Sequence, residues 1–275
     1  MFRELTQSLL AVVLPSNCSV CGSEIQEWGA LGICRACRES VQPWEGSVCA
    51  RCGLPLATTW PGNSPDYLCG VCRIHPFHFD WARVYGLYGG VLRQCILQLK
   101  FGRRERMAQR LGLLLGWVWQ RQQALLELES PMIVPVPLHP SREQVRGFNQ
   151  SCLLARALAK SLRRARFNPR LQVEASLLAR VRPTTPQTGL SLAARRENVR
   201  GGFRVRRPER CRGRKIVLVD DVMTTGSTLS ACAAALKAAG ARQVFALAVA
   251  RSTPQFPDAS VALAAEVDAR AEDRT

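Results

Sequence analysis

The chain has 275 residues, of which 47% are hydrophobic, so it can bury a sizeable core and is not a largely disordered protein. Its net charge is +17, yet residues 1–80 carry 5 Lys and Arg against 7 Asp and Glu, so the whole excess lies after them. No apolar run approaches the length of a membrane span, and the run at 9–14 is too short for a secretory signal. We therefore expect a cytoplasmic protein with no membrane span.

The N-terminal part carries a repeated metal-binding pattern. Residues 2–14 predict a short amphipathic helix. Eight of the 12 cysteines follow as four Cys-x-x-Cys pairs, namely Cys18/Cys21, Cys34/Cys37, Cys49/Cys52 and Cys69/Cys72. In a reducing cytoplasm such pairs indicate metal binding rather than disulfides. Two pairs supply four thiolates to a tetrahedral Zn²⁺ ion with no open position, so the sequence predicts two structural zinc ions.

A glycine after the first and third pairs, Gly22 and Gly53, indicates a duplicated unit. We therefore pair Cys18/Cys21 with Cys34/Cys37 and Cys49/Cys52 with Cys69/Cys72, and spacing alone leaves an interleaved arrangement open. An iron–sulfur cluster is the alternative metal group, although Cys-x-x-Cys turns that occur in pairs favour a single tetrahedral ion. His75 and His78 are interpreted as linker residues, because the cysteine set is already complete.

Strand and helix patterns alternate after residue 80. Residues 79–88 predict a strand, 91–100 a helix and about 107–128 a longer helix. A buried strand at 132–136 runs into a proline-rich loop, because proline does not continue a central strand, and a further helix ends near residue 164. The loop carries Arg142 and Arg146, which can bind pyrophosphate through charge-assisted hydrogen bonds. The alternative is a solvated basic loop.

The most basic stretch is 163–215, with 15 Arg and one Lys against Glu174, Glu197 and Glu209. The positive electrostatic potential of such a stretch attracts polyanions, including nucleic acid and anionic membrane surfaces. A genome that favours arginine codons would give the same composition without any partner, and 34 Arg against 4 Lys keeps that alternative open. Within the stretch, 182–199 is a polar insertion marked by Pro and Gly. It is interpreted as a mobile lid, with a plain connector or a nucleic-acid-binding arm as alternatives.

The segment 216–228, Ile-Val-Leu-Val-Asp-Asp-Val-Met-Thr-Thr-Gly-Ser-Thr, is the most informative part of the chain. It predicts a buried strand, an acidic pair at the strand's carboxyl end, and a hydroxyl-rich loop before a helix at about 229–239. Open α/β sheets bind ligands at this place, and a helix N-terminus is suited to phosphate. Carboxylates suit sugar hydroxyls or a metal carried by the substrate. The predicted ligand is a phosphorylated sugar, and the alternative is an acidic pair that only caps the helix.

The spacing excludes a Walker loop and a dinucleotide fingerprint. The segment instead resembles the phosphoribosyl-pyrophosphate (PRPP) signature of type I phosphoribosyltransferases. A last buried strand is predicted at 243–250. The expected division of the chain is therefore an N-terminal helix and double ribbon at 1–80, a ligand-binding domain at 81–256 and an exposed tail at 257–275.

Three further motifs join the cysteine pairs and the PRPP signature: Arg-Gly-Phe-Asn-Gln at 146–150, Pro-Gln at 186–187 and Arg-Arg-Glu-Asn-Val at 195–199. Together they resemble the ComF family of double zinc-ribbon, phosphoribosyltransferase-like proteins linked to DNA uptake. The resemblance covers nearly the whole chain. It implies an α/β fold with a type I phosphoribosyltransferase-like parallel sheet flanked by helices, behind an N-terminal double zinc ribbon.

The resemblance also implies PRPP bound with Mg²⁺. Asp220 and Asp221 would hold the ribose hydroxyls, and Arg142 and Arg146 would face the pyrophosphate. The 5′-phosphate would be cradled by the loop residues Thr224, Thr225, Gly226, Ser227 and Thr228.

Two classes of function remain open. The enzyme would transfer phosphoribosyl from PRPP to a nitrogen nucleophile and release pyrophosphate, with the two acids and the two arginines as the catalytic set. The binding protein would sense PRPP or handle single-stranded DNA beside a competence or DNA-processing partner. The slight acidity of residues 1–80 predicts that the ribbon docks on its own basic domain or on a protein partner, rather than on nucleic acid.

Overall fold

A computed structural model describes residues 17–25, 32–56, 67–101, 106–122, 125, 127–128, 131–167, 171–182 and 201–252. The predicted helix at 2–14 and the tail at 257–275 lie outside these residues, as does the predicted insertion at 182–199 apart from Arg182. None of the described helices combines the length and the apolar character that a bilayer crossing requires.

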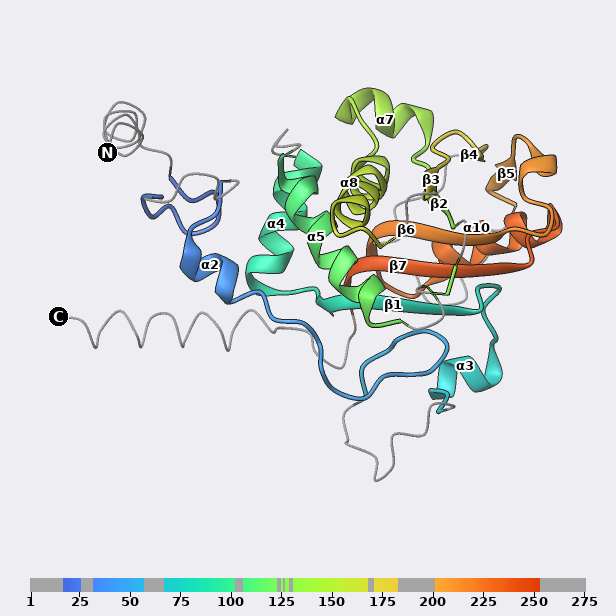
Figure 1. The fold of residues 1–275 in the computed structure, drawn as a ribbon, viewed down its shortest axis with the longest axis horizontal. Coiled ribbons are helices and arrows are strands. Elements are labelled where there is room, and N and C mark those ends of the chain that lie inside the picture. Colours follow the sequence, from blue (N-terminus) through green and yellow to red (C-terminus); the bar gives the residue numbers. More distant parts are fainter. Residues whose placement is uncertain are drawn as a thin grey trace.

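The centre of the protein is a five-stranded parallel sheet in the order β1-β7-β6-β2-β3 (Figure 1). Its strands are β1 Trp81–Leu87, β2 Met132–Pro135, β3 Gln172–Val173, β6 Lys215–Met223 and β7 Gln243–Arg251. The two central strands β6 and β7 are buried over almost their whole length, as expected for parallel strands covered on both faces. The predicted α/β fold with a parallel sheet is confirmed.

Helices cover both faces of this sheet. On one face lie α4 (Gly90–Phe101), α5 (Arg106–Gln120) and α8 (Gln150–Arg164), which Figure 1 shows side by side. On the other face α10 (Ser227–Ala238) packs on β6 and β7 together with the hairpin of β4 (Leu178–Arg180) and β5 (Phe203–Val205). Because strand side chains alternate between faces, β6 contributes to two separate hydrophobic cores.

Two predicted boundaries need correction. The helix expected over about 107–128 ends at Gln120, where a polar run from 120 to 123 interrupts the apolar stripe. The loop that carries Arg142 and Arg146 contains a helix, α7 (Pro140–Arg146). Pro140 occupies its first turn, and Gly147 closes it in the left-handed conformation, so both end signals are present in the sequence. A 3₁₀ turn, η1 (Pro208–Arg210), precedes β6.

The ribbon region packs along the outer edge of β1. The Trp44 N–H donates to the Tyr85 carbonyl (2.8 Å), and the Ala82 N–H donates to the Arg51 carbonyl (2.7 Å). Contact is so close at Gly53 that a Cβ atom there would lie 2.6 Å from the Ala82 carbonyl oxygen. An edge strand that would otherwise offer unpaired backbone groups is thus covered by the protein itself. The ribbon therefore packs on the larger domain of its own chain, which is the first of the two surfaces predicted for its docking.

Candidate metal centres and ligand-binding site

The four cysteine pairs form two clusters, Cys18/Cys21/Cys34/Cys37 and Cys49/Cys52/Cys69/Cys72. Within each cluster the four Sγ atoms lie within 4.8 Å of one another. The Cys21 and Cys34 sulfurs are 3.6 Å apart, and the Cys52 and Cys69 sulfurs are 3.7 Å apart. Four sulfurs at about 2.3 Å from a tetrahedral Zn²⁺ ion would be about 3.8 Å apart, so both clusters fit structural zinc. The sequential pairing of the cysteines is the one that the structure adopts.

Each cluster is built from one tight turn and one short helix. Gly22 and Gly53 have φ angles of 77° and 63°, which L side chains rarely adopt, and they turn the chain just after the first and third pairs. Cys34 precedes α2 (Arg35–Glu39), and Cys69 precedes α3 (Gly70–Ile74), so the remaining pairs lie on first helical turns. The N–H groups near Cys18 outweigh its burial, which alone would raise its pKa, and lower that pKa to about 6. A lowered pKa favours the thiolate at Cys18, whereas burial raises the pKa of Cys34 and of Cys37 in the same cluster.

Two arginines lie beside the second cluster. Arg251, which is buried, donates from Nη1 to the Cys52 carbonyl (3.1 Å), and Arg83 donates from Nη1 to the Ala50 carbonyl (2.9 Å). Burial lowers the pKa of both guanidinium groups, and the neighbouring thiolates oppose that shift. Because Zn²⁺ with four thiolates has a net charge of −2, two guanidinium groups are suited to balance it.

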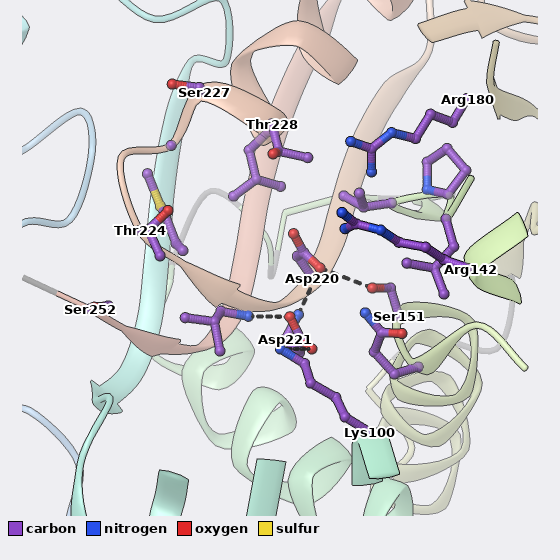
Figure 2. Close-up of a pocket in the computed structure, with 18 of the residues that line it drawn as sticks. Lys100, Arg142, Ser151, Arg180, Asp220, Asp221, Thr224, Ser227, Thr228 and Ser252 are labelled. Atoms are coloured by element: carbon purple, nitrogen blue, oxygen red, sulfur yellow. Dashed lines mark hydrogen bonds and ion pairs between the residues drawn. The ribbon is translucent and has the colours of Figure 1, made fainter. Parts of the chain in front are cut away.

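A cavity of about 340 Å³ opens at the carboxyl ends of β2 and β6 (Figure 2). After β2 the chain passes through α8 to β3, which lies on one side of the β2–β6 pair in the strand order. After β6 it passes through α10 to β7, which lies on the other side of this pair. This divergence is the topological switch point at which open α/β sheets bind ligands. The predicted site residues that line the cavity are Arg142, Arg146, Asp220, Asp221, Thr224, Gly226, Ser227 and Thr228. Thr225 is not one of the lining residues, and its Oγ1 lies 2.9 Å from the Ser227 Oγ.

The acidic pair is held by a network of short contacts. Asp220 Oδ1 accepts hydrogen bonds from the Ser151 hydroxyl (2.9 Å) and from the Asp221 N–H (2.9 Å). Asp221 Oδ1 accepts from the Val222 N–H (2.7 Å), and Asp221 Oδ2 lies 2.7 Å from the Lys100 ammonium. Burial, with repulsion from Asp221, raises the pKa of Asp220 to about 7. The pair is therefore oriented before any ligand binds.

The loop at 223–228, named here the phosphate loop, depends on Gly226. This residue is the N-cap of α10 with φ of 81°, and a Cβ atom there would lie 2.7 Å from the Met223 Cε atom. The left-handed backbone angle therefore favours glycine, whereas the Met223 methyl group ends a flexible side chain that can move aside. Because glycine offers no capping side chain, the N-terminal amides of α10 are suited to an anionic ligand.

Four cations line the same cavity: Lys100, Arg142, Arg146 and Arg180. Figure 2 shows Arg142 and Arg180 on the side of the cavity opposite the phosphate loop. Asp220 lies between these two arginines and the loop. Arg146 donates to the Gln150 Oε1 atom (2.6 Å), and its guanidinium carbon lies 5.1 Å from the centre of the Phe101 ring. A ligand with negative charge at two ends and hydroxyls between them matches this distribution.

The cavity's polar residues that were not predicted as site residues are Tyr88, Lys100, Gln150, Ser151, Arg180 and Ser252. Lys100 lies in the last turn of α4, Ser151 lies in the first turn of α8, and Arg180 ends β4. Arg180 was visible only as one of the arginines of the basic stretch. No local motif marks Lys100 or Ser151, because tertiary packing brings them to the acidic pair.

The fold and the cavity define a phosphoribosyltransferase-like protein with an N-terminal double zinc ribbon. The sequence matches the double zinc ribbon domain over residues 9–73 and the phosphoribosyl transferase domain over 149–268. It is 35% identical to the DNA utilization protein YhgH of Escherichia coli O157:H7, over 85% of this chain and 96% of that protein. Identity to competence protein F of Haemophilus influenzae is 29%, over 80% of this chain and 91% of that protein. The chain belongs to the ComF family.

Solved structures give a weaker likeness. The glutamine PRPP amidotransferase from B. subtilis, complexed with ADP and GMP, superposes with a TM-score of 0.36 at 19% identity. The match covers 56% of this chain and only 30% of the amidotransferase chain.

Proposed function

We propose that this protein binds PRPP in the cavity between β2 and β6 and transfers its phosphoribosyl group to a nitrogen nucleophile, with release of pyrophosphate. One observation carries the proposal. The acidic pair Asp220/Asp221 and the phosphate loop at the start of α10 line a single cavity, together with four cations. A sugar with a 5′-phosphate and a pyrophosphate offers the complementary groups in the same order.

In this arrangement the 5′-phosphate lies in the phosphate loop, where backbone N–H groups and hydroxyls donate to it. The ribose hydroxyls donate to Asp220 and Asp221, and the pyrophosphate faces Arg142, Arg146 and Arg180. Mg²⁺ would enter with the substrate and neutralise pyrophosphate charge when bound. The cavity's carboxylate and hydroxyl oxygens are ligands of the kind that Mg²⁺ accepts.

In the proposed transfer, a bond forms between the nucleophile's nitrogen and the anomeric carbon while the bond from that carbon to pyrophosphate breaks. Positive charge develops on the sugar ring, and the acidic pair below it is suited to stabilise that charge. The departing pyrophosphate takes the bonding electrons, and the arginines stabilise it. The nitrogen then releases its proton to solvent water. Catalysis in this proposal comes mainly from positioning and fixed charge.

Calorimetry with PRPP and Mg²⁺, followed by pyrophosphate release with a panel of bases, amines and oligonucleotides, tests the proposal. Asp221→Ala removes a charged acceptor, so we expect a loss of about 1.5–3 kcal/mol, or roughly 10- to 100-fold in affinity. A matched control is Asp80→Ala, which removes an ion-paired carboxylate at the amino end of β7. Unchanged PRPP affinity in the Asp220→Ala, Asp221→Ala double variant would refute the site.

The second candidate is a protein that senses PRPP or handles single-stranded DNA without turnover. The names of two relatives, a DNA utilization protein and a competence protein, favour it. So do the exposed arginines of the described part of 163–215, which are Arg163, Arg164, Arg166, Arg182, Arg204, Arg206, Arg210 and Arg212. Phosphate contacts would dominate, so affinity should fall steeply with salt. Eight thiols kept for metal suit a reducing compartment, so the cytoplasm is the proposed location.

Oligonucleotide binding titrated against salt, with and without PRPP, separates the two candidates. Absence of binding at low salt removes the nucleic-acid role and favours the enzyme. Displacement of the oligonucleotide by PRPP places both ligands in one site, whereas simultaneous binding places the arginines on a second surface. PRPP binding without pyrophosphate release, across the whole panel of acceptors, favours the sensor.

A further inference from the structure

The segment that follows the second cysteine cluster packs against the phosphate loop. A Cβ atom at Gly226 would lie 3.2 Å from the Phe77 Cε1 atom and 3.4 Å from its Cζ atom. Phe77 is 7% exposed, and its ring stacks on Phe79 at 4.8 Å between centroids. The next residue, His78, donates its N–H to the Ser230 hydroxyl (3.1 Å) in the first turn of α10. The Phe77 ring therefore supports the loop at the residue whose backbone angle is most restricted.

Hydrogen bonds tie this support to the second cluster. Arg51, which lies between Cys49 and Cys52, donates from Nη1 to the Phe77 carbonyl (3.4 Å). On the other side, Arg251 donates to the Cys52 carbonyl (3.1 Å), and the Ser252 N–H donates to the carbonyl of Met223, where the phosphate loop begins. The second cluster is thus hydrogen-bonded to Phe77, which packs against the phosphate loop, and to the end of β7, which lies beside the start of that loop.

The first cluster is placed differently. Cys18 and Cys37 pack in the core formed with α4 and α5, on the opposite face of the sheet, and Gln98 donates to the Ser19 carbonyl (3.3 Å). Its Cys21 is exposed, whereas all four cysteines of the second cluster are buried. Across the described residues, no hydrogen bond or core contact joins the first cluster to the phosphate loop.

We propose that the second cysteine cluster positions the phosphate loop through Phe77, and that the first cluster does not. Phe77 is a positioning residue, since it acts through Gly226 and does not line the cavity. Without the ring, the loop loses packing on one side and samples other conformations. A ligand must then order the loop as it binds, which lowers its affinity. The identity of that ligand rests on the proposed function, but the ordering of the loop does not.

The experiment uses the full zinc-loaded chain and two readouts. Amide hydrogen exchange of residues 223–230 without ligand reports the loop, and calorimetry with PRPP and Mg²⁺ reports the site. For Phe77→Ala we expect two zinc equivalents, exchange in the loop faster by about tenfold or more, and PRPP affinity weaker by about tenfold. Phe77→Leu keeps part of the apolar volume, so its loop exchange and its PRPP affinity should lie between those of Phe77→Ala and those of the unmodified protein. If Phe77→Ala does not fold, Phe77→Leu takes its place in the test.

Three controls separate positioning from general stability. Leu236→Ala removes a buried side chain from the same core near the far end of α10, and we expect lower thermal stability but unchanged loop exchange and PRPP affinity. Ile74→Ala changes an exposed side chain three residues before Phe77 and should alter neither readout. Cys21→Ser disturbs the first cluster and should leave the loop within about twofold of the unmodified protein.

The proposal is overturned if Phe77→Ala and Phe77→Leu keep the loop exchange of the unmodified protein, or if Leu236→Ala or Cys21→Ser loosens the loop as much. If the unmodified protein does not bind PRPP, the proposed function fails, and the exchange measurement still decides whether Phe77 orders the loop.

Discussion

Replacing Lys100 with methionine tests how the acidic pair is stabilised. The Lys100 ammonium lies 2.7 Å from the Asp221 Oδ2 atom, and the two side chains are 19% and 6% exposed. Methionine keeps most of the apolar stem but removes the charge, so Asp221 stays buried with the Val222 N–H as its remaining hydrogen bond from the backbone. Removing one partner of a buried ion pair is strongly destabilising, because the other charge is left uncompensated.

The expected magnitude follows from this burial. Breaking a buried pair costs about 3–5 kcal/mol, and the partial exposure of Lys100 places this pair at the lower end, about 3 kcal/mol. For a chain of this size, each kcal/mol lowers the Tm by about 2–4 °C, so Lys100→Met should lower it by roughly 6–12 °C. Thermal unfolding at neutral pH without ligand measures this. The Lys100→Met, Asp221→Asn double variant should recover most of the loss, because the Asp221 charge is removed together with its partner.

A second lysine provides a matched control. Lys237 pairs with Asp80 at nearly the same distance, 2.8 Å, but their side chains are 32% and 34% exposed. Partly solvated pairs contribute about 0–1 kcal/mol, so Lys237→Met should lower the Tm by less than about 4 °C. Equal effects of the two lysine variants, or no recovery in the double variant, would show that the buried ion pair does not stabilise the acidic pair.

Three further predictions follow from the site. Metal analysis of the purified protein should give about two zinc equivalents, and one equivalent or stoichiometric iron would contradict the assignment of both clusters. Asp220 has a pKa of about 7, above its unfolded value of about 3.9, so its contribution to stability is present below about pH 4 and is lost as the pH rises through about 7. Thermal unfolding from pH 4 to 8 should therefore show a steeper decline for the unmodified protein than for Asp220→Asn, and parallel curves would contradict this. Gly226→Ala should weaken PRPP binding by about tenfold or more, because its φ of 81° opposes a Cβ atom and the buried Phe77 ring would lie 3.2 Å from it. Calorimetry measures it against Gly213→Ala, which has a similar φ of 68° but open space around its Cβ position.

The parts of the site that lie in one continuous segment could be predicted from the sequence. The strand, the acidic pair and the phosphate loop are encoded within residues 216–228, where apolar, acidic and small residues follow one another in the order in which the chain uses them. The cysteine clusters were predictable for a related reason, since each pair lies within a single turn and the two pairs of a cluster are neighbours along the chain.

Site residues from distant elements that carry no motif of their own could not be predicted, in contrast to Arg142 and Arg146. Lys100 reaches Asp221 only because α4 packs beside the carboxyl end of β6, and Ser151 reaches Asp220 from α8. Nothing in the sequence near Lys100 or Ser151 indicates an acidic partner. The support of Gly226 by Phe77 is of the same kind, because it depends on how the ribbon region packs against α10.

The cover over the outer edge of β1 matters while the chain is being synthesised, because its strands emerge from the ribosome one after another. Of the described strands, β1 is the first to leave the ribosome and β7, its partner in the sheet, is the last. Unpaired strand edges are sites of aggregation while a protein is being synthesised. The residues that cover β1 through Trp44 and Arg51 precede it in the chain and are available before β1 emerges. We therefore expect the ribbon to protect the nascent sheet, a role in biogenesis that does not depend on PRPP.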